Sequence, residues 1–78
     1  MALLRKFEER HKTTPSVHDE VDCSYAIFEI DGASYLQLDT YGSPESQNPD
    51  AVKQIIQIDA DSARELQRLI GRAFPELR

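Results

Sequence analysis

A chain of 78 residues has apolar side chains for only one small core, so we expect a single domain that spans residues 1–78. Its apolar share of 40%, its charged share of 29% and its few glycines and prolines exclude collagen-like, low-complexity and wholly disordered chains. The formal net charge is −5, and residues 15–59 alone carry −8, because nine acidic residues there are balanced only by Lys53. A small acidic protein with this central segment repels phosphates and attracts basic partners.

The N-terminus carries no sign of export or membrane insertion. No apolar run approaches the roughly 18 residues of a membrane span, and Arg5 and Lys6 follow the first apolar residues before a signal-peptide core forms. We therefore expect a soluble, cytoplasmic protein without a membrane partner. The single cysteine, Cys23, excludes an internal disulfide and the zinc sites built from two or more cysteines.

The first segment predicts a short amphipathic helix over residues 2–12. Leu3, Leu4 and Phe7 recur at helical spacing with charged residues between them. Pro15 then disfavours helical geometry in the residue before it, and the charged residues that follow are typical of a loop. Residues 13–23 are therefore expected to form an irregular link between the helix and the first strand.

Two aromatic and β-branched runs, residues 24–30 and 34–41, predict antiparallel strands joined through Asp31-Gly32, the dipeptide typical of a tight hairpin. A two-residue turn would pair Phe28 with Tyr35, whereas a three-residue turn would pair Phe28 with Ser34. We favour the three-residue turn, because it gathers the following on one core face: Ala26, Phe28, Ile30, Leu36 and Leu38. The opposite face then holds Tyr25, Ile27, Glu29, Tyr35, Gln37, Asp39 and Tyr41.

The second half of the chain predicts a loop, a strand and a helix. Residues 42–50 are rich in turn formers, and residues 52–58 have the branched side chains of a third strand. Asp59 occupies the N-cap position of a helix over residues 60–73, which Pro75 ends. The apolar face of this helix is expected to cover the sheet and consists of Ala63, Leu66, Leu69, Ile70, Ala73 and Phe74.

The predicted fold class is therefore α+β, in the order α-β-β-β-α. A three-stranded antiparallel sheet is covered on one face by the C-terminal helix, and the N-terminal helix packs at an edge or on a partner. Arginines recur on the solvent side of the C-terminal helix at positions 64, 68 and 72, near Asp61 and Glu65. Local ion pairs on a solvated face are the favoured interpretation, and a phosphate-contacting ridge is the alternative.

Candidate groups for chemistry are few, and none of them forms a catalytic signature. The nucleophiles and bases are Cys23, His11, His18 and neighbouring carboxylates, and Cys23 at a strand start is typical of a small buried apolar residue. The donors of His18, Asp19, Asp22 and Cys23 lack the paired spacing of a metal site. No glycine-rich phosphate loop is present. We therefore expect no enzyme, with no catalytic residue, metal or cofactor.

The predicted sheet has large apolar groups on both faces, so one helix cannot cover everything. The second face should contact a basic protein surface or a second copy of the chain, and its contact residues are Tyr25, Ile27, Tyr35, Gln37, Asp39 and Tyr41. The sequence thus predicts a non-enzymatic, homodimeric interaction module that binds a basic partner, as an accessory or inhibitor protein that imitates the charge of nucleic acid. The alternative is a regulatory protein whose tyrosines stack on single-stranded nucleic acid, with Lys53, Arg64, Arg68 and Arg72 on its phosphates.

The layout of residues 27–70 also resembles a known family. Ile27-Phe28-Glu29-Ile30-Asp31-Gly32 and Leu36-Gln37-Leu38-Asp39-Thr40-Tyr41, a proline-containing loop, Ile56-Gln57-Ile58-Asp59 and a helix with Ala63 and Leu66 are similar to the transcriptional positive-cofactor-like family that binds single-stranded DNA. The resemblance implies a dimeric sheet-plus-helix module. Members carry basic residues along the sheet and loop, where this chain has Asp39, Glu45 and Asp50. The segment Leu36-Gln37-Leu38-Asp39-Thr40-Tyr41-Gly42-Ser43 also resembles small uncharacterised prokaryotic proteins.

Overall fold

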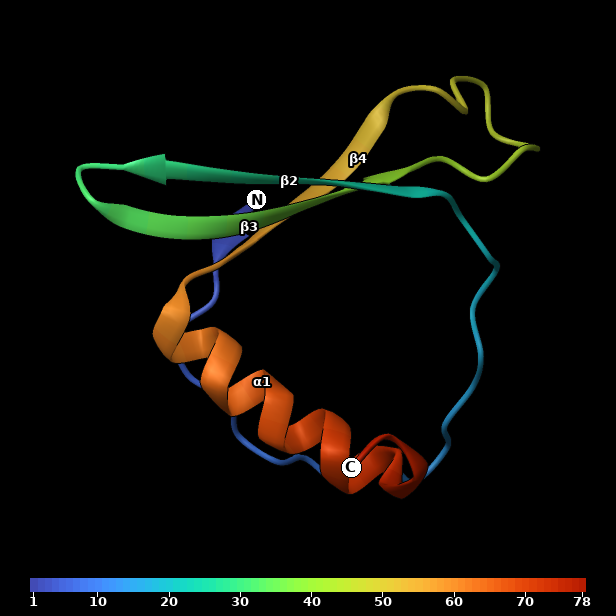
Figure 1. Ribbon diagram of the computed structural model, residues 1–78. Helices are drawn as coiled ribbons and strands as arrows, with labels where there is room; N and C mark the ends of the chain where they lie inside the picture. The colour runs from blue at the N-terminus through green and yellow to red at the C-terminus, as the bar shows by residue number, and fades with distance from the viewer.

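The computed structural model describes residues 1–78 and consists of one sheet and one long helix (Figure 1). Four strands form the sheet: β1 (Ala2–Leu3), β2 (Cys23–Ile30), β3 (Ala33–Tyr41) and β4 (Val52–Ile58). The helix α1 (Ala60–Ala73) follows β4 directly, and a 3₁₀ turn, η1 (Pro75–Leu77), ends the chain. The α+β class is therefore confirmed, with a mixed sheet in place of the expected antiparallel one.

The strand order is β1-β4-β3-β2, and β1 is the strand that the sequence did not predict. Ala2 and Leu3 pair in parallel with Ile56 and Gln57 of β4, and the amide of Leu4 donates to the carbonyl of Gln57 at 2.9 Å. The predicted helix over residues 2–12 is therefore wrong. An isolated helix of that length is marginal in water, whereas the open edge of β4 offers its first residues backbone partners.

The β2–β3 hairpin has the two-residue turn, so the three-residue register favoured from the sequence is wrong. Phe28 lies opposite Tyr35, and their rings stack with centroids 5.7 Å apart. Asp31 and Gly32 both have positive φ, 51° and 81°, which is the backbone of the primed turns that match the twist of paired strands. An aspartate tolerates this conformation better than most residues, so no third loop residue is needed.

This register decides which side chains share a face, because residues directly opposite in neighbouring strands point to the same side of a sheet. One side, the apolar face, holds six residues in two cross-strand rows: Ile27, Leu36 and Ile58, then Tyr25, Leu38 and Ile56. The other side is named the polar face for its hydrogen-bonded side chains, and it also has apolar residues. It holds Leu3, Ser24, Ala26, Phe28, Ile30, Tyr35, Gln37, Asp39, Tyr41, Ile55 and Gln57.

The helix α1 confirms the predicted bounds and the predicted cap. The Asp59 side chain accepts from the backbone amide of Ser62 at 3.0 Å, and the Asp59 amide donates to Ser62 Oγ at 3.0 Å. This reciprocal pair satisfies two donors at a helix start and leaves Ser62 only 1% exposed. Pro75 follows the C-cap residue Phe74 and lies in the first position of η1, where its missing amide costs no hydrogen bond.

The cap predicts a pH-dependent stability. The backbone amide of Ser62 is the main reason that the pKa of Asp59 lies below its usual 3.8, since it favours the charged carboxylate. A lowered folded-state pKa adds stability that is present above pH 3.8 and is lost as the pH falls through the folded value. Asp59→Asn, which keeps an acceptor, should melt below the wild type at pH 7, and the difference should shrink in acid. Thermal denaturation at pH 7 and at pH 3 measures the melting temperature of both proteins. An equal difference in melting temperature at the two pH values would contradict the charge effect.

The helix α1 does not cover the sheet, contrary to the sequence prediction. After Ile58 the helix leads away from the strands, as Figure 1 shows. Ile58 is the one apolar side chain that is fully buried, and Ile70 and Phe74 are 40% and 51% exposed. Asp59 alone separates β4 from α1, and the helix then runs away from the sheet, as Figure 1 shows.

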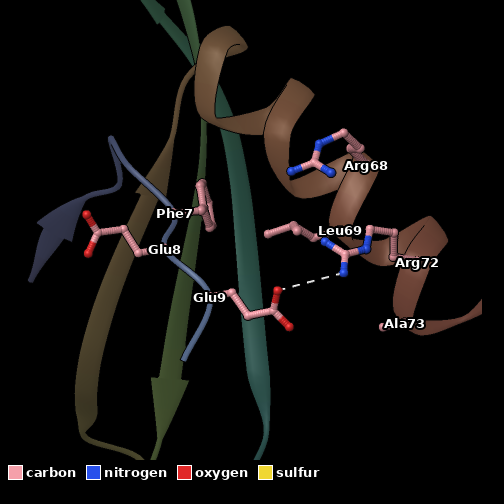
Figure 2. A pocket seen from close by; sticks show the side chains of 7 residues that line it. All are labelled: Phe7, Glu8, Glu9, Arg68, Leu69, Arg72 and Ala73. Atoms are coloured by element: carbon pink, nitrogen blue, oxygen red, sulfur yellow. Dashed lines mark ion pairs between the residues drawn. The ribbon is translucent and has the colours of Figure 1, made fainter. Parts of the chain in front are cut away.

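Residues 4–22, named the connector here, link β1 to β2 without regular secondary structure. Figure 2 shows Phe7 and Glu9 of the connector beside Leu69 and Arg72 of α1. The Arg72 guanidinium lies 3.8 Å from the Glu9 carboxylate, and Phe7 and Leu69 are half-buried. The connector therefore packs on one flank of α1 before it returns to the sheet.

No helix in the chain has the length and apolar character needed to cross a bilayer.

Candidate functional site

The six contact residues predicted from the sequence do not share one surface. The observed register places Tyr25 and Ile27 on the apolar face. Tyr35, Gln37, Asp39 and Tyr41 lie on the polar face. The sheet therefore offers two different surfaces, and the expected single tyrosine-bearing face does not form.

Side-chain hydrogen bonds on the polar face form a ladder that joins β3 to β4, and a separate pair joins β3 to β2. Gln57 Nε2 of β4 donates to Gln37 Oε1 of β3 at 2.9 Å, and Gln37 Nε2 donates to Asp39 Oδ1 at 3.0 Å. The hydroxyls of Ser24 and Tyr41 lie 2.9 Å apart and share a hydrogen bond. This ladder fixes the side-chain orientations and leaves the second Asp39 oxygen and the hydroxyl pair as hydrogen-bonding sites for a partner.

An acidic recess lies at the end of the sheet, where β3 leads into the loop that follows it. Its volume is about 710 Å³, and it is lined by Glu20, Val21, Asp22, Gly42, Pro44, Pro49 and Asp50. The amide of Tyr41 donates to the carbonyl of Asp22 at 3.1 Å, and this bond attaches the end of the connector to β3. Three carboxylates line the recess and the Lys53 side chain lies beside its lining residue Gly42, so the charge there is net negative and attracts a basic side chain.

The apolar face is the most exposed apolar surface of the sheet. Tyr25 and Ile27 are 72% and 74% exposed, while their neighbours Leu36 and Leu38 are half-buried. A shallow apolar hollow lies where this face meets the start of α1, and its lining includes Ile27, Leu36, Ile58 and Ala63. The register places one charged residue on this face, Glu29 beside the hairpin turn, and Asp59 lines the hollow where the face meets α1.

The three helix arginines have acidic neighbours, which agrees with the solvated-face interpretation. Arg64 pairs with Asp61 at 3.2 Å, Arg68 pairs with Glu65, and Arg72 pairs with Glu9 of the connector. The hydrogen bond from Arg68 lowers the pKa of Glu65 and raises the pKa of Arg68. Each pair is exposed and therefore weak.

Lys53 lies at the start of β4, at the opposite end of that strand from α1. Its side chain approaches Gly42 at the end of β3, so it does not join the arginines in one basic ridge. The four cations expected on a phosphate backbone are thus divided between two ends of the molecule.

The groups considered for chemistry lie apart from one another. Cys23 is exposed at the start of β2, contrary to the expected buried position, and its thiol donates only to the carbonyl of Ser24 at 3.5 Å. No group of three or more His, Cys, Asp or Glu side chains is arranged to hold a metal ion. His11 and His18 lie in the exposed connector.

Sequence reasoning missed the acidic recess as a site, although its residues were visible as part of the acidic segment. Glu20, Asp22 and Asp50 are distant in the sequence and become neighbours only because Asp22 bonds to β3 beside the loop. The charge asymmetry of residues 15–59 was the available signal.

Comparison with protein-family models, curated proteins and solved structures finds no match to this chain.

Proposed function

We propose that the protein is a non-enzymatic, self-associating interaction module. It binds a basic protein partner through the acidic recess and the adjoining polar face, and it acts as an accessory or inhibitor protein of the cytoplasm. The two roles belong to opposite sides of the sheet: the apolar face serves self-association, and the polar face with its recess serves the partner.

The acidic recess at the end of β3 is the observation that supports this proposal most. Glu20, Asp22 and Asp50 surround one hollow, and Asp39 and the Tyr41 hydroxyl lie on the strand that borders it. Lysine or arginine side chains suit such a surface, because carboxylates form charge-assisted hydrogen bonds with them. Tyrosine adds apolar contact area with a polar tip, which is why it is enriched at protein interfaces.

The alternative proposal is binding of single-stranded nucleic acid by the aromatic residues of the sheet. Phe28 and Tyr35 stack on the polar face with their rings at 24° to each other, and exposed aromatic rings are the platforms on which bases stack. The charges oppose it, since nucleic-acid affinity comes largely from cations on phosphates. The helix arginines are already paired with carboxylates, and Lys53 lies at the far end of β4.

A salt titration separates the two proposals. The protein is titrated with a fluorescent lysine-rich peptide and with a fluorescent single-stranded oligonucleotide, from low to physiological salt, and anisotropy is recorded. We expect binding of the peptide that weakens as salt rises, and no retention of the oligonucleotide at any salt concentration. Tight, steeply salt-dependent binding of the oligonucleotide alone would overturn the basic-partner proposal.

A further inference from the structure

The strand β2 forms one edge of the sheet and has no hydrogen-bonding neighbour on its outer side. The strand order β1-β4-β3-β2 places it last, and seven of its eight residues are exposed. The opposite edge is β1, which has only two residues and therefore offers little backbone for pairing. The outer side of β2 is thus the long unpaired edge of the sheet.

The hairpin register identifies which backbone groups of β2 point outward. Residues of an antiparallel pair alternate between those that exchange hydrogen bonds and those whose amide and carbonyl point away from the neighbouring strand. The Tyr41 amide donates to the Asp22 carbonyl at 3.1 Å, so Asp22 and every second residue after it face β3. No backbone hydrogen bond in the chain uses the outward groups. They belong to Cys23, Tyr25, Ile27 and Glu29.

The β2 edge lacks the features that usually prevent pairing with another chain, which are lysine, proline or a bulge. Its sequence holds neither lysine nor proline, and its pairing with β3 is regular from end to end. No lysine or arginine occurs between Lys12 and Lys53. The outward residues also present apolar side chains, since Tyr25 and Ile27 are 72% and 74% exposed on the apolar face. An edge of this kind accepts another extended segment.

The charges around the β2 edge decide which segment fits it. Glu20 and Asp22 of the acidic recess precede the strand, Glu29 and Asp31 lie at its hairpin end, and all four are exposed. A second β2 paired antiparallel would bring the recess end of one chain to the hairpin end of the other, so carboxylates would meet carboxylates. A segment with lysine or arginine at its ends meets opposite charge at both ends. The charges therefore favour a basic partner over a second copy.

We propose that the basic partner supplies an extended segment that adds to β2 as a fifth strand, antiparallel to it. The backbone of this segment bonds to the outward amides and carbonyls of β2. Its alternate apolar side chains lie beside Tyr25 and Ile27, and its basic ends contact the recess and the hairpin carboxylates. The inference rests on the basic partner of the proposed function and assigns the way in which that partner binds.

Methylation of the peptide backbone tests the strand addition with the protein unchanged. The probe is a fluorescent peptide as long as β2, with alternating isoleucine and threonine and with lysines at both ends. One version is N-methylated at the isoleucine amides, and the matched control at the threonine amides, so both have the same side chains and charge. In antiparallel pairing the residues that bond to β2 have their side chains beside Tyr25 and Ile27. We expect isoleucine methylation to weaken binding at least about tenfold by anisotropy, and threonine methylation to leave it nearly unchanged.

Amide hydrogen exchange followed by NMR locates the added strand. In the protein alone the outward amides of Tyr25 and Ile27 should exchange quickly, whereas those of Ala26 and Phe28, which face β3, should exchange slowly. Saturation with the unmethylated peptide should slow exchange at Tyr25 and Ile27 at least about tenfold. Slow exchange at these two amides without peptide would show that a second copy already pairs with the edge, and would overturn the proposal.

The remaining outcomes separate strand addition from the proposed function. Equal affinities for the two methylated peptides, with exchange in β2 unchanged on binding, would overturn strand addition and leave charge-driven binding at the recess. Failure of every lysine-bearing peptide to bind at low salt would overturn the basic partner and the added strand together.

Discussion

Ile27→Glu should convert the protein from a dimer to a monomer. In the proposed self-association through the apolar face, the exposed Ile27 side chain leaves water, and a carboxylate there would be buried without a partner. Burial of an unpaired charge costs about 3 kcal/mol or more, which weakens dimerisation at least about a hundredfold. Light scattering coupled to size-exclusion chromatography at a series of protein concentrations measures the shift in mass.

A charge placed on the connector is the matched control. Val17 is fully exposed, so Val17→Glu makes the same change in net charge without touching either face of the sheet. This variant should keep the mass of the wild-type dimer, and circular dichroism should show the same helix and strand content for all three proteins. Equal masses for Ile27→Glu and the wild type would contradict the assignment of the apolar face to self-association.

Local signals in the sequence were sufficient to predict α1 and β4. The bounds of both elements agree with the structure, because the Asp59 cap and Pro75 delimit the helix and branched side chains mark the strand. The pairs of Arg64 and Arg68 with acidic residues one turn earlier were predicted for the same reason. Each of these features depends on residues fewer than five positions apart, and such interactions are visible in a linear pattern.

Features that depend on distant residues were not predictable in the same way. β1 exists because the edge of β4 accepts Ala2 and Leu3, more than fifty positions earlier in the chain, and their own pattern indicated a helix. The hairpin register was decided by positive φ at Asp31, where the sequence alone allowed either turn. That single difference moved Tyr25 and Ile27 to the opposite side from Tyr35 and divided the predicted site.

The sequence indicated that the sheet has more apolar surface than one helix can cover. In the structure α1 covers even less of the sheet than expected. The sequence predicted that α1 would cover one face and leave the other to a partner. In the single chain α1 covers neither face fully, and the surface left open is the apolar one, while hydrogen bonds between side chains organise the other. Under the proposed function the tyrosines therefore differ in role: Tyr25 would contact the second copy of the chain, and Tyr35 and Tyr41 would contact the partner.

Reversal of three charges in the acidic recess should abolish binding of the lysine-rich peptide. The variant carries Glu20→Lys, Asp22→Lys and Asp50→Lys, which raises the formal net charge from −5 to +1, since each reversal adds two. The peptide then meets repulsion where three carboxylates attracted it. If each lost contact is worth about 1 kcal/mol at an exposed site, three together weaken binding by about two orders of magnitude. Fluorescence anisotropy at physiological salt measures the loss.

A second triple variant separates the recess from net charge in general. Glu8→Lys, Asp61→Lys and Glu76→Lys also give +1, but these residues lie on the connector, on α1 and on η1, away from the recess. At physiological salt, interactions between exposed charges fade beyond about 8 Å, so this variant should retain most of the peptide binding. Equal losses in both variants would show that overall charge governs the interaction and would remove the recess from the binding site. A loss confined to the first variant, with the mass in solution unchanged, would show that binding of the peptide depends on the recess and is separate from self-association.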